Sequence, residues 1–479
     1  MSRVLQEHAK ASKNLSGDPI HDLRTALRRC LTIESAMSEL DPHPAWKKLR
    51  RTGKKLMKGL GSLRDSEVLL GWLSKFENAN RTVGQALETS LQLEFDLAKK
   101  EAQGALKSFG REKWAILQKL LVERAARLIP ETAPAQYLAL ERWDEAYKKH
   151  RFALRSRSKI SYHRARAGLK TFRYTLENFM PGLHAKWRGD VKQLQDMLGE
   201  VHDLDVLWTK IVALRPAQND AAGMEWKTAI ESERMFRLAQ YRTKTRGKNS
   251  IWQAWRAALP HGDAQEEAAL AKLSVWSAYR TPEFTRAERV ATLSAELYDL
   301  LAARGFTVGL PTERGRVILR AAALLEDVGR MSGNKGHHKE SYRLIHKLPL
   351  PLGWRPSELQ LVALVARYHR KALPQLKHKE FSSLSSSFRQ ATLLLAGILR
   401  LAICCEQSPI QIRRMDLEVT LDGLLIRAYG FDGEEPLLSK LATAKHLLEI
   451  ACRRPIAILP GVAGTPVRTS DLKTKTAAA

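Results

Sequence analysis

The chain has 479 residues, and its hydrophobic share of 44% is enough for packed cores, which excludes a disordered chain. It carries 79 Lys and Arg against 51 Asp and Glu, a formal net charge of +28, so we expect an acidic partner such as nucleic acid, polyphosphate or anionic lipid. The N-terminus is polar, and the longest apolar run, 391–405, is broken by Arg400. We therefore expect no membrane span and a cytoplasmic location.

Residues 1 to about 260 show apolar residues at helical spacing and few prolines, which predicts helices nearly throughout. One pattern occurs twice in this region. It begins as IHDLRTALRR at Ile20 and as HRARAGLKTFRY at His163, and some 40 residues later continues as GLGSLRDSEVLL and MLGEVHDLDVLW. An internal repeat of this kind predicts two related helical bundles, at about 1–105 and 145–250.

In each repeat the first helix is expected to carry a row of cations on one face. Counting from His21 the cations stand at i, i+3 and i+7, and counting from His163 they stand at i, i+3, i+7 and i+10, which places them one helical turn apart. Such a row suits a polyanion of repeating charge, because arginine offers paired donors to phosphate oxygens. A solvated outer face is the alternative interpretation of any single row, and the recurrence of the row argues against it.

The combined pattern, His-x-x-Arg-x-x-x-Arg/Lys followed by Leu-Gly-x-x-Arg/His-Asp, resembles the conserved histidine α-helical domain, CHAD, over roughly residues 1–250. The resemblance implies two pseudo-symmetric four-helix bundles with a basic channel for inorganic polyphosphate. The chain departs from the family pattern at Leu31 and Thr171, where a further cation is usual. Transferred position by position, the resemblance implies these polyphosphate-binding residues: His21, Arg24, Arg28, Lys54, Arg64, His163, Arg166, Lys170, Arg173, Tyr174, Lys192 and His202.

The C-terminal part is again helical from Pro282, and after Cys405 it changes to two β-like runs around an Asp-Gly turn, a helix and a third strand. The segments SGNKGHHKES and RYHRKALP resemble the C-terminal, HD-type domain of the exopolyphosphatase/guanosine pentaphosphatase (Ppx/GppA) family. We therefore expect a mainly α chain with a small C-terminal β element. Its expected parts are a CHAD domain at 1–260, an HD-like domain at 275–460 and a disordered tail at 461–479.

Catalytic HD domains hold a metal with an early histidine, a His-Asp pair, a later histidine and a late aspartate. The corresponding positions here read Arg286, Glu326-Asp327 and Ile403, which leaves Asp327 and His338 as the candidate metal ligands. The actin-like catalytic domain of the resembled family is also missing from the sequence pattern. We therefore expect no catalytic residue, no metal and no cofactor. A cationic set remains that is expected to hold phosphate: Lys335, His337, His338, Lys339, His369, Arg370 and Lys371.

The leading prediction is a protein that binds inorganic polyphosphate, targets granules or serves as a scaffold, and has a polyphosphate-metabolising enzyme as a second partner. One alternative is a metal-dependent phosphohydrolase that acts on polyphosphate or a phosphorylated nucleotide. The other is a protein that binds nucleic acid non-specifically through its phosphates. The basic rows lack interleaved aromatic residues, and no helix-turn-helix or zinc-finger signature is apparent, which disfavours nucleic acid.

Overall fold

The computed structural model describes residues 1–461, except 16, 77–78, 80, 215–220, 307–310, 371, 408–411, 413 and 432–436. The described chain is helical apart from one small sheet, so the mainly α prediction is confirmed. The chain divides into two compact units, Met1–Tyr279 and Arg280–Ala479. The predicted phosphate ligand Lys371 and nearly all of the predicted tail, from residue 462 on, lie outside the described residues.

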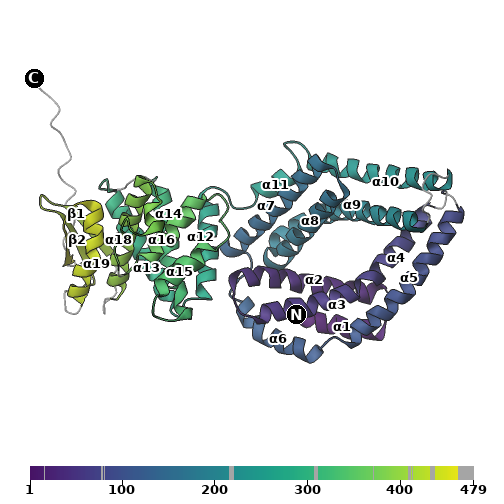
Figure 1. Cartoon of the computed structure of the whole chain (residues 1–479), viewed down its shortest axis with the longest axis horizontal. Helices are drawn as coiled ribbons and strands as arrows, with labels where there is room; N and C mark the ends of the chain where they lie inside the picture. The colour runs from purple at the N-terminus through teal and green to yellow at the C-terminus, as the bar shows by residue number, and fades with distance from the viewer. Residues whose placement is uncertain are drawn as a thin grey trace, which may run out of the picture. The chain divides into compact units, whose positions relative to one another are not determined.

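The first unit consists of two successive sets of helices that follow the two sequence repeats (Figure 1). The first set comprises α1 Ser2–Lys13, α2 Gly17–Leu40, α3 Ala45–Gly59, α4 Gly61–Leu73, the 3-10 turn Ser74–Phe76, α5 Arg81–Lys107 and α6 Arg111–Ala125. The second set comprises α7 Ala133–Ser156, α8 Lys159–Phe179, α9 Pro181–Leu214, α10 Ala221–Thr245, α11 Ile251–Ala257 and α12 Asp263–Ala278.

The two repeats share a core where the α4–α5 turn of the first meets the α9–α10 turn of the second. Each repeat contributes a buried tryptophan, Trp72 and Trp226, together with leucines such as Leu87 and Leu204. Burial of each large apolar side chain stabilises the fold by about 1.5–3 kcal/mol. Helices α2 and α8 also pack against each other, so corresponding parts of the two repeats meet at two places.

The repeats differ in their second element. In the second repeat it is one unbroken helix, α9, whereas in the first repeat Leu60 separates α3 from α4. Leu60 itself has φ −96° and ψ −2°. The break lies directly before Gly61 of the repeated motif, beside the cationic face of α2.

The second unit is a helical domain with a three-stranded sheet at its C-terminal end. Its elements are α13 Phe284–Ala302, α14 Thr312–Leu325, the 3-10 helix Val328–Ser332, α15 His337–His346, α16 Pro356–Arg367, α17 Lys379–Ser382, α18 Ser386–Glu406, β1 Arg414–Val419, β2 Leu424–Tyr429, α19 Leu437–Cys452 and β3 Ile456–Pro460. β1 and β2 form the predicted antiparallel hairpin, and β3 pairs in parallel with β2.

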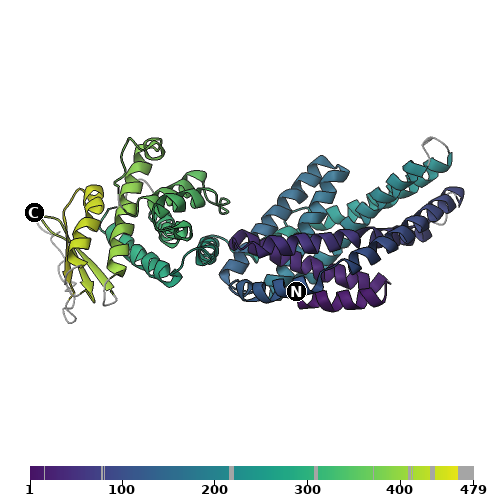
Figure 2. The same cartoon turned by 60° about the horizontal axis from the view of Figure 1, so that its bottom comes forward.

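Helix α18 is the central helix of this unit, and α19 packs against it beside the sheet (Figure 2). The two helices approach closely at Gly397, where an added Cβ would stand 2.8 Å from the backbone of Leu448. Within the described residues α18 is the one helix long and apolar enough to cross a membrane, but 72% of that stretch is buried inside the protein. Its composition is therefore that of a core helix.

Candidate cationic binding site

Helices α2 and α8 each combine a buried apolar face with a cationic face. On α2 the buried face includes Ile20, Leu23 and Leu27, and on α8 it includes Leu169 and Phe172. Helix α8 starts at a Ser158 cap, whose Oγ accepts a hydrogen bond from the Ser161 backbone N–H. Because the apolar faces fix the rotation of both helices, the cationic rows that start at the two repeated histidines are held in a defined orientation.

In both repeats the first arginine of the row lies against the repeated glycine of the second element. Arg24 Nη1 donates a hydrogen bond to the Leu60 carbonyl at 2.7 Å, and an added Cβ on Gly61 would stand 3.6 Å from the same nitrogen. A Cβ on Gly199 would stand 3.7 Å from Arg166 Nε. The glycine of the repeated Leu-Gly motif therefore leaves room for a guanidinium beside the helix backbone.

The repeated histidines meet the basic residue that precedes the repeated aspartate. In the second repeat His163 Nδ1 lies 3.4 Å from His202 Nδ1. In the first repeat burial, followed by the charge of Arg64, lowers the pKa of His21. Burial, followed by the charges of Arg166 and His163, lowers the pKa of His202 to about 4. We expect His202 to be neutral at physiological pH, able to accept or donate one hydrogen bond.

Charges of the two repeats act on one another across the unit. Burial, followed by Arg166 and then by Arg28 of the other repeat, lowers the pKa of Lys170 to about 7. Burial raises the pKa of Asp203 to about 6, against the opposing effect of Arg166 and Lys170. Asp65 of the first repeat also contributes to the electrostatic environment of Asp203. The cationic rows of the two repeats therefore form one site.

Positive charge is in surplus at this site. Lys170 interacts there with Arg24, Arg28 and Arg166, against one carboxylate, that of Asp203. Burial, followed by repulsion from Arg166 and Arg28, lowers the pKa of Lys170, so an anion that entered the site would relieve the repulsive part of this cost.

Two arginine side chains of the second repeat have unused hydrogen-bonding capacity. Arg166 Nε and Arg173 Nε are buried without a hydrogen-bond partner among the described residues. Arg173 Nη1 donates to Gln195 Oε1 at 3.1 Å, and its guanidinium lies 5.8 Å from the ring centre of Tyr174, which is buried. The sequence did not single out Gln195, which orients Arg173 from α9.

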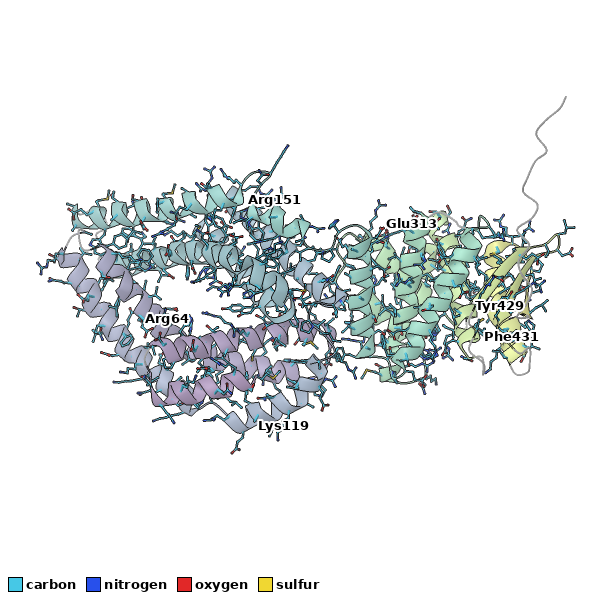
Figure 3. The ribbon with its side chains drawn as sticks, turned by 180° about the vertical axis from the view of Figure 1, so that it is seen from behind. Arg64, Lys119, Arg151, Glu313, Tyr429 and Phe431 are labelled. Carbon is cyan, nitrogen blue, oxygen red and sulfur yellow. The ribbon has the colours of Figure 1, made fainter. Side chains whose placement is uncertain are left out.

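The remaining predicted ligands of this unit lie further toward solvent. Lys54 on α3 and Lys192 on α9 are exposed at corresponding positions of the two repeats. Arg64 lies on the inner side of the unit (Figure 3) and pairs with Glu67 at 3.0 Å. These residues extend the positive field around the buried cations.

The second unit holds a different cluster around Glu326 and Asp327, both almost fully buried. Arg286 Nη1 donates to Glu326 Oε1 and to Asp327 Oδ2, each at 2.8 Å, and its Nε lies 3.2 Å from Glu406 Oε2. Arg330 Nε lies 2.9 Å from Asp327 Oδ1. Each carboxylate of this cluster therefore faces a guanidinium.

Two of the predicted phosphate-binding histidines belong to this buried cluster. His337 Nε2 lies 3.3 Å from Asp327 Oδ1, and His369 Nε2 lies 3.3 Å from Glu326 Oε2. Their Nδ1 atoms lie within hydrogen-bonding distance of the carbonyls of Asn334 and Ala366. Burial lowers the pKa of His369 to about 3, which keeps this imidazole neutral. Both histidines support the turn from inside the domain through these Nδ1 contacts. Asp327 Oδ1 and Glu326 Oε2 are buried without a hydrogen-bond partner among the described residues.

The residues of this cluster do not fit a metal ion as they stand. Asp327, His337 and His369 offer three ligand atoms within 4.8 Å of one another, so the structure groups Asp327 with these histidines and not with the predicted His338. Arg286, however, donates to Glu326 Oε1 and Asp327 Oδ2, and Arg330 Nε lies 2.9 Å from Asp327 Oδ1, so two guanidiniums already stand beside these carboxylates. A guanidinium at this position supplies the positive charge that a metal supplies in a catalytic HD site.

The accessible cations of the second unit surround the turn before α15. Gly333 and Gly336 have φ values of 120° and 80°, which L side chains rarely adopt, so the glycine-punctuated turn predicted from the sequence requires these two residues. Lys335, Lys339 and Arg370 are exposed around it, and His338 is half-buried. Arg370 Nη1 also lies 3.4 Å from His337 Nε2 and so connects the exposed rim to the buried cluster.

Two stretches of the chain match known domain families. A family model of the CHAD domain matches residues 2–212, and one of Ppx/GppA phosphatase, domain III, matches residues 279–421. The chain joins a CHAD domain to a Ppx/GppA domain III. No curated protein matches the chain. Both domain types fit a polyphosphate-related function, and the cationic site between the repeats lies within the residues matched by the CHAD model.

Proposed function

We propose that this protein binds inorganic polyphosphate at the cationic site between the two repeats of its CHAD domain. The observation that carries the proposal is the cross-repeat grouping of Arg28 with Arg166 and Lys170, which gives the site more cations than carboxylates. A phosphate chain carries one negative charge per unit, and the rows repeat their cations once per helical turn. Desolvated arginines in such a row make stronger hydrogen bonds to phosphate than exposed lysines do.

The accessible cations of domain III would provide a second, weaker contact for the same ligand. Lys335, Lys339 and Arg370 are exposed around a turn whose backbone N–H groups can approach phosphate closely. We propose no hydrolysis here, because Arg286 donates to both carboxylates and so places a positive charge beside the groups that would otherwise hold a metal. A role at cytoplasmic polyphosphate granules, in targeting or as a scaffold for a polyphosphate-metabolising enzyme, follows from this function.

The test is a titration of the full chain with long-chain polyphosphate at several salt concentrations, with Lys170→Glu beside Lys119→Glu. The control residue Lys119 is exposed on the outer side of α6 (Figure 3), so Lys119→Glu makes the same substitution away from the site. We expect Lys170→Glu to weaken binding at least tenfold and Lys119→Glu less than twofold. Equal losses in the two variants would mean that the ligand responds to net charge alone.

Duplex DNA at matched phosphate concentration separates this proposal from the nucleic-acid alternative. The affinity of non-specific binding depends on the number of phosphates contacted and on the salt concentration, and it does not depend on which polyanion carries the phosphates. A flexible, single chain of phosphates can adapt its path to cations that stand one helical turn apart, whereas the phosphates of a duplex are fixed on a stiff double helix. We expect excess DNA to leave bound polyphosphate in place, and displacement at equal phosphate would favour the alternative.

A further inference from the structure

Helix α3 carries a second concentration of positive charge, on its outer face. Its 15 residues include no carboxylate. Arg50 pairs with Glu34 of α2 at 2.7 Å. The other cations of the helix are all exposed: Lys47, Lys48, Arg51, Lys54, Lys55 and Lys58.

The second repeat serves as an internal reference for this face. When Gly61 is aligned with Gly199, Lys54 corresponds to Lys192, so this cation is common to both repeats. On the same alignment Thr52, Lys55 and Lys58 correspond to Asp190, Gln193 and Asp196 of α9. The site between the repeats therefore does not require Lys55 and Lys58, because the related helix replaces them with neutral and acidic residues.

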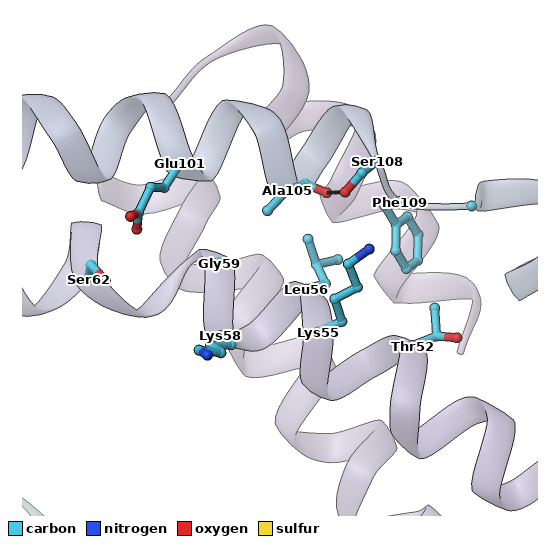
Figure 4. Close-up of a pocket in the computed structure, with 11 residues that line it drawn as sticks. Thr52, Lys55, Leu56, Lys58, Gly59, Ser62, Glu101, Ala105, Ser108 and Phe109 are labelled. Atoms are coloured by element: carbon cyan, nitrogen blue, oxygen red, sulfur yellow. Dashed lines mark hydrogen bonds between the residues drawn. The ribbon is translucent and has the colours of Figure 1, made fainter.

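These two lysines line a groove between α3 and α5 with a volume of about 550 Å³. Leu56, Ala105 and Phe109 form its apolar lining, and Lys55, Leu56 and Ala105 point into it (Figure 4). The helices approach closely at Gly59, where an added Cβ would stand 2.4 Å from the Ala105 Cβ. A side chain at position 59 would thus push α5 away.

The groove combines three kinds of chemistry. Its apolar lining offers nothing to a bare phosphate chain, whereas Lys55 and Lys58 offer ammonium groups to an anion. Hydroxyls of Thr52, Ser62 and Ser108 and the carboxylate of Glu101 complete the lining. Its volume is that of a site for one small molecule. The best match is an anion that also has a flat apolar body and hydroxyl groups.

We propose that this groove binds a nucleoside phosphate, separately from the polyphosphate site. The base packs against Leu56 and Phe109, and the phosphates are held by Lys55 and Lys58. Glu101 accepts a hydrogen bond from a sugar hydroxyl. The site belongs to the first repeat alone, because Gln193 and Asp196 replace the two lysines in the second.

The test titrates the full chain with ATP, with inorganic triphosphate and with adenosine. It is carried out in the Lys170→Glu background, so that the site between the repeats cannot hold the probe. We expect one ATP per chain, with triphosphate and adenosine each bound at least tenfold more weakly. Triphosphate that binds as tightly as ATP would show that charge alone is recognised and would overturn the proposal.

Two variants locate the probe. Lys55→Glu should weaken ATP binding at least tenfold, whereas Lys119→Glu, an equal change of charge on α6, should weaken it less than twofold. Ser108→Trp fills the groove without changing charge and should also abolish ATP binding, while polyphosphate binding by the otherwise unmodified chain stays within twofold. ATP binding that survives both Lys55→Glu and Ser108→Trp would overturn the proposal.

Discussion

The two domains contain buried charge clusters that differ in their balance. In the CHAD domain Lys170 interacts with three arginines, Arg24, Arg28 and Arg166, and with one carboxylate, Asp203, and its pKa is lowered to about 7. In domain III each of Glu326, Asp327 and Glu406 faces the guanidinium of Arg286. The difference separates a site that an anion would stabilise from a cluster that is already neutralised from within. We expect mutations to affect binding in the first and folding in the second.

The largest change in stability is expected for Arg286→Met. This variant leaves the carboxylates of Glu326 and Asp327 buried without the positive charge of the Arg286 guanidinium. Removal of one partner from a buried ion pair costs about 3–5 kcal/mol of unfolding free energy. Amide hydrogen exchange followed by peptide should show loss of protection across domain III and none in the CHAD domain. Arg289→Met is the control, because Arg289 also pairs with Glu406 but is 48% exposed, and it should cost less than about 1 kcal/mol. Unchanged exchange in Arg286→Met would contradict a neutralising role.

In the CHAD domain, Lys170→Met is expected to raise the free energy of unfolding, whereas Arg286→Met lowers it. Burial and neighbouring cations lower the pKa of Lys170 to about 7 in the folded protein, so the charged form destabilises the fold at and below that pH. An apolar side chain of similar length should raise the unfolding free energy by about 1–3 kcal/mol at pH 6. The gain should shrink as the pH rises above 7, where the wild-type lysine loses its proton. Denaturant titrations at pH 6 and pH 9 measure this, and a destabilised variant at pH 6 would contradict surplus charge.

The sequence predicted the cationic faces of the two repeats but not the interaction between them. Helical spacing was enough to place Arg24, Arg28, Arg166 and Lys170 on cationic faces, because the period of a helix is fixed by its backbone. Repeat spacing alone could not show that Arg28 acts on Lys170 of the other repeat, since this depends on the packing of α2 against α8.

In domain III the sequence showed that Arg286 replaces an expected histidine, but not what Arg286 does there. The histidines of the HHK and YHR segments looked equally accessible, whereas His337 and His369 are buried and His338 is not. Arg330 was not singled out, although its position three residues after Asp327 on a helical turn was a usable signal. Burial of individual residues within a helical turn depends on tertiary packing, which motif spacing does not encode.

Polyphosphate affinity should fall as the pH rises from 5.5 to 8. Over this range Lys170, with a pKa of about 7, loses a positive charge, and Asp203, with a pKa of about 6, gains a negative one. His202 has a pKa of about 4 and stays neutral throughout. We expect at least a tenfold loss of affinity in wild type and a flatter profile in Lys170→Met, measured by titration at constant ionic strength. An affinity that rises with pH would contradict the assignment of both groups to the site.

The smallest change in polyphosphate affinity is expected for substitutions at the exposed rim of domain III. Lys339→Glu changes a charge that is fully accessible to solvent, where screening by salt weakens its field. We expect less than a threefold loss of polyphosphate affinity at physiological salt, against the tenfold loss for Lys170→Glu. A loss at Lys339 as large as that at Lys170 would place the main binding surface in domain III and reverse the comparison.

The most direct test of the central claim is the stoichiometry of binding by calorimetry, with a short polyphosphate of defined length. Arg28→Glu alters the first repeat and Lys170→Glu alters the second. If the repeats form one site, the wild type binds one chain per protein, and either variant weakens that single site at least tenfold. Two chains per wild-type protein, with each variant abolishing one and leaving the other at full affinity, would contradict a shared site.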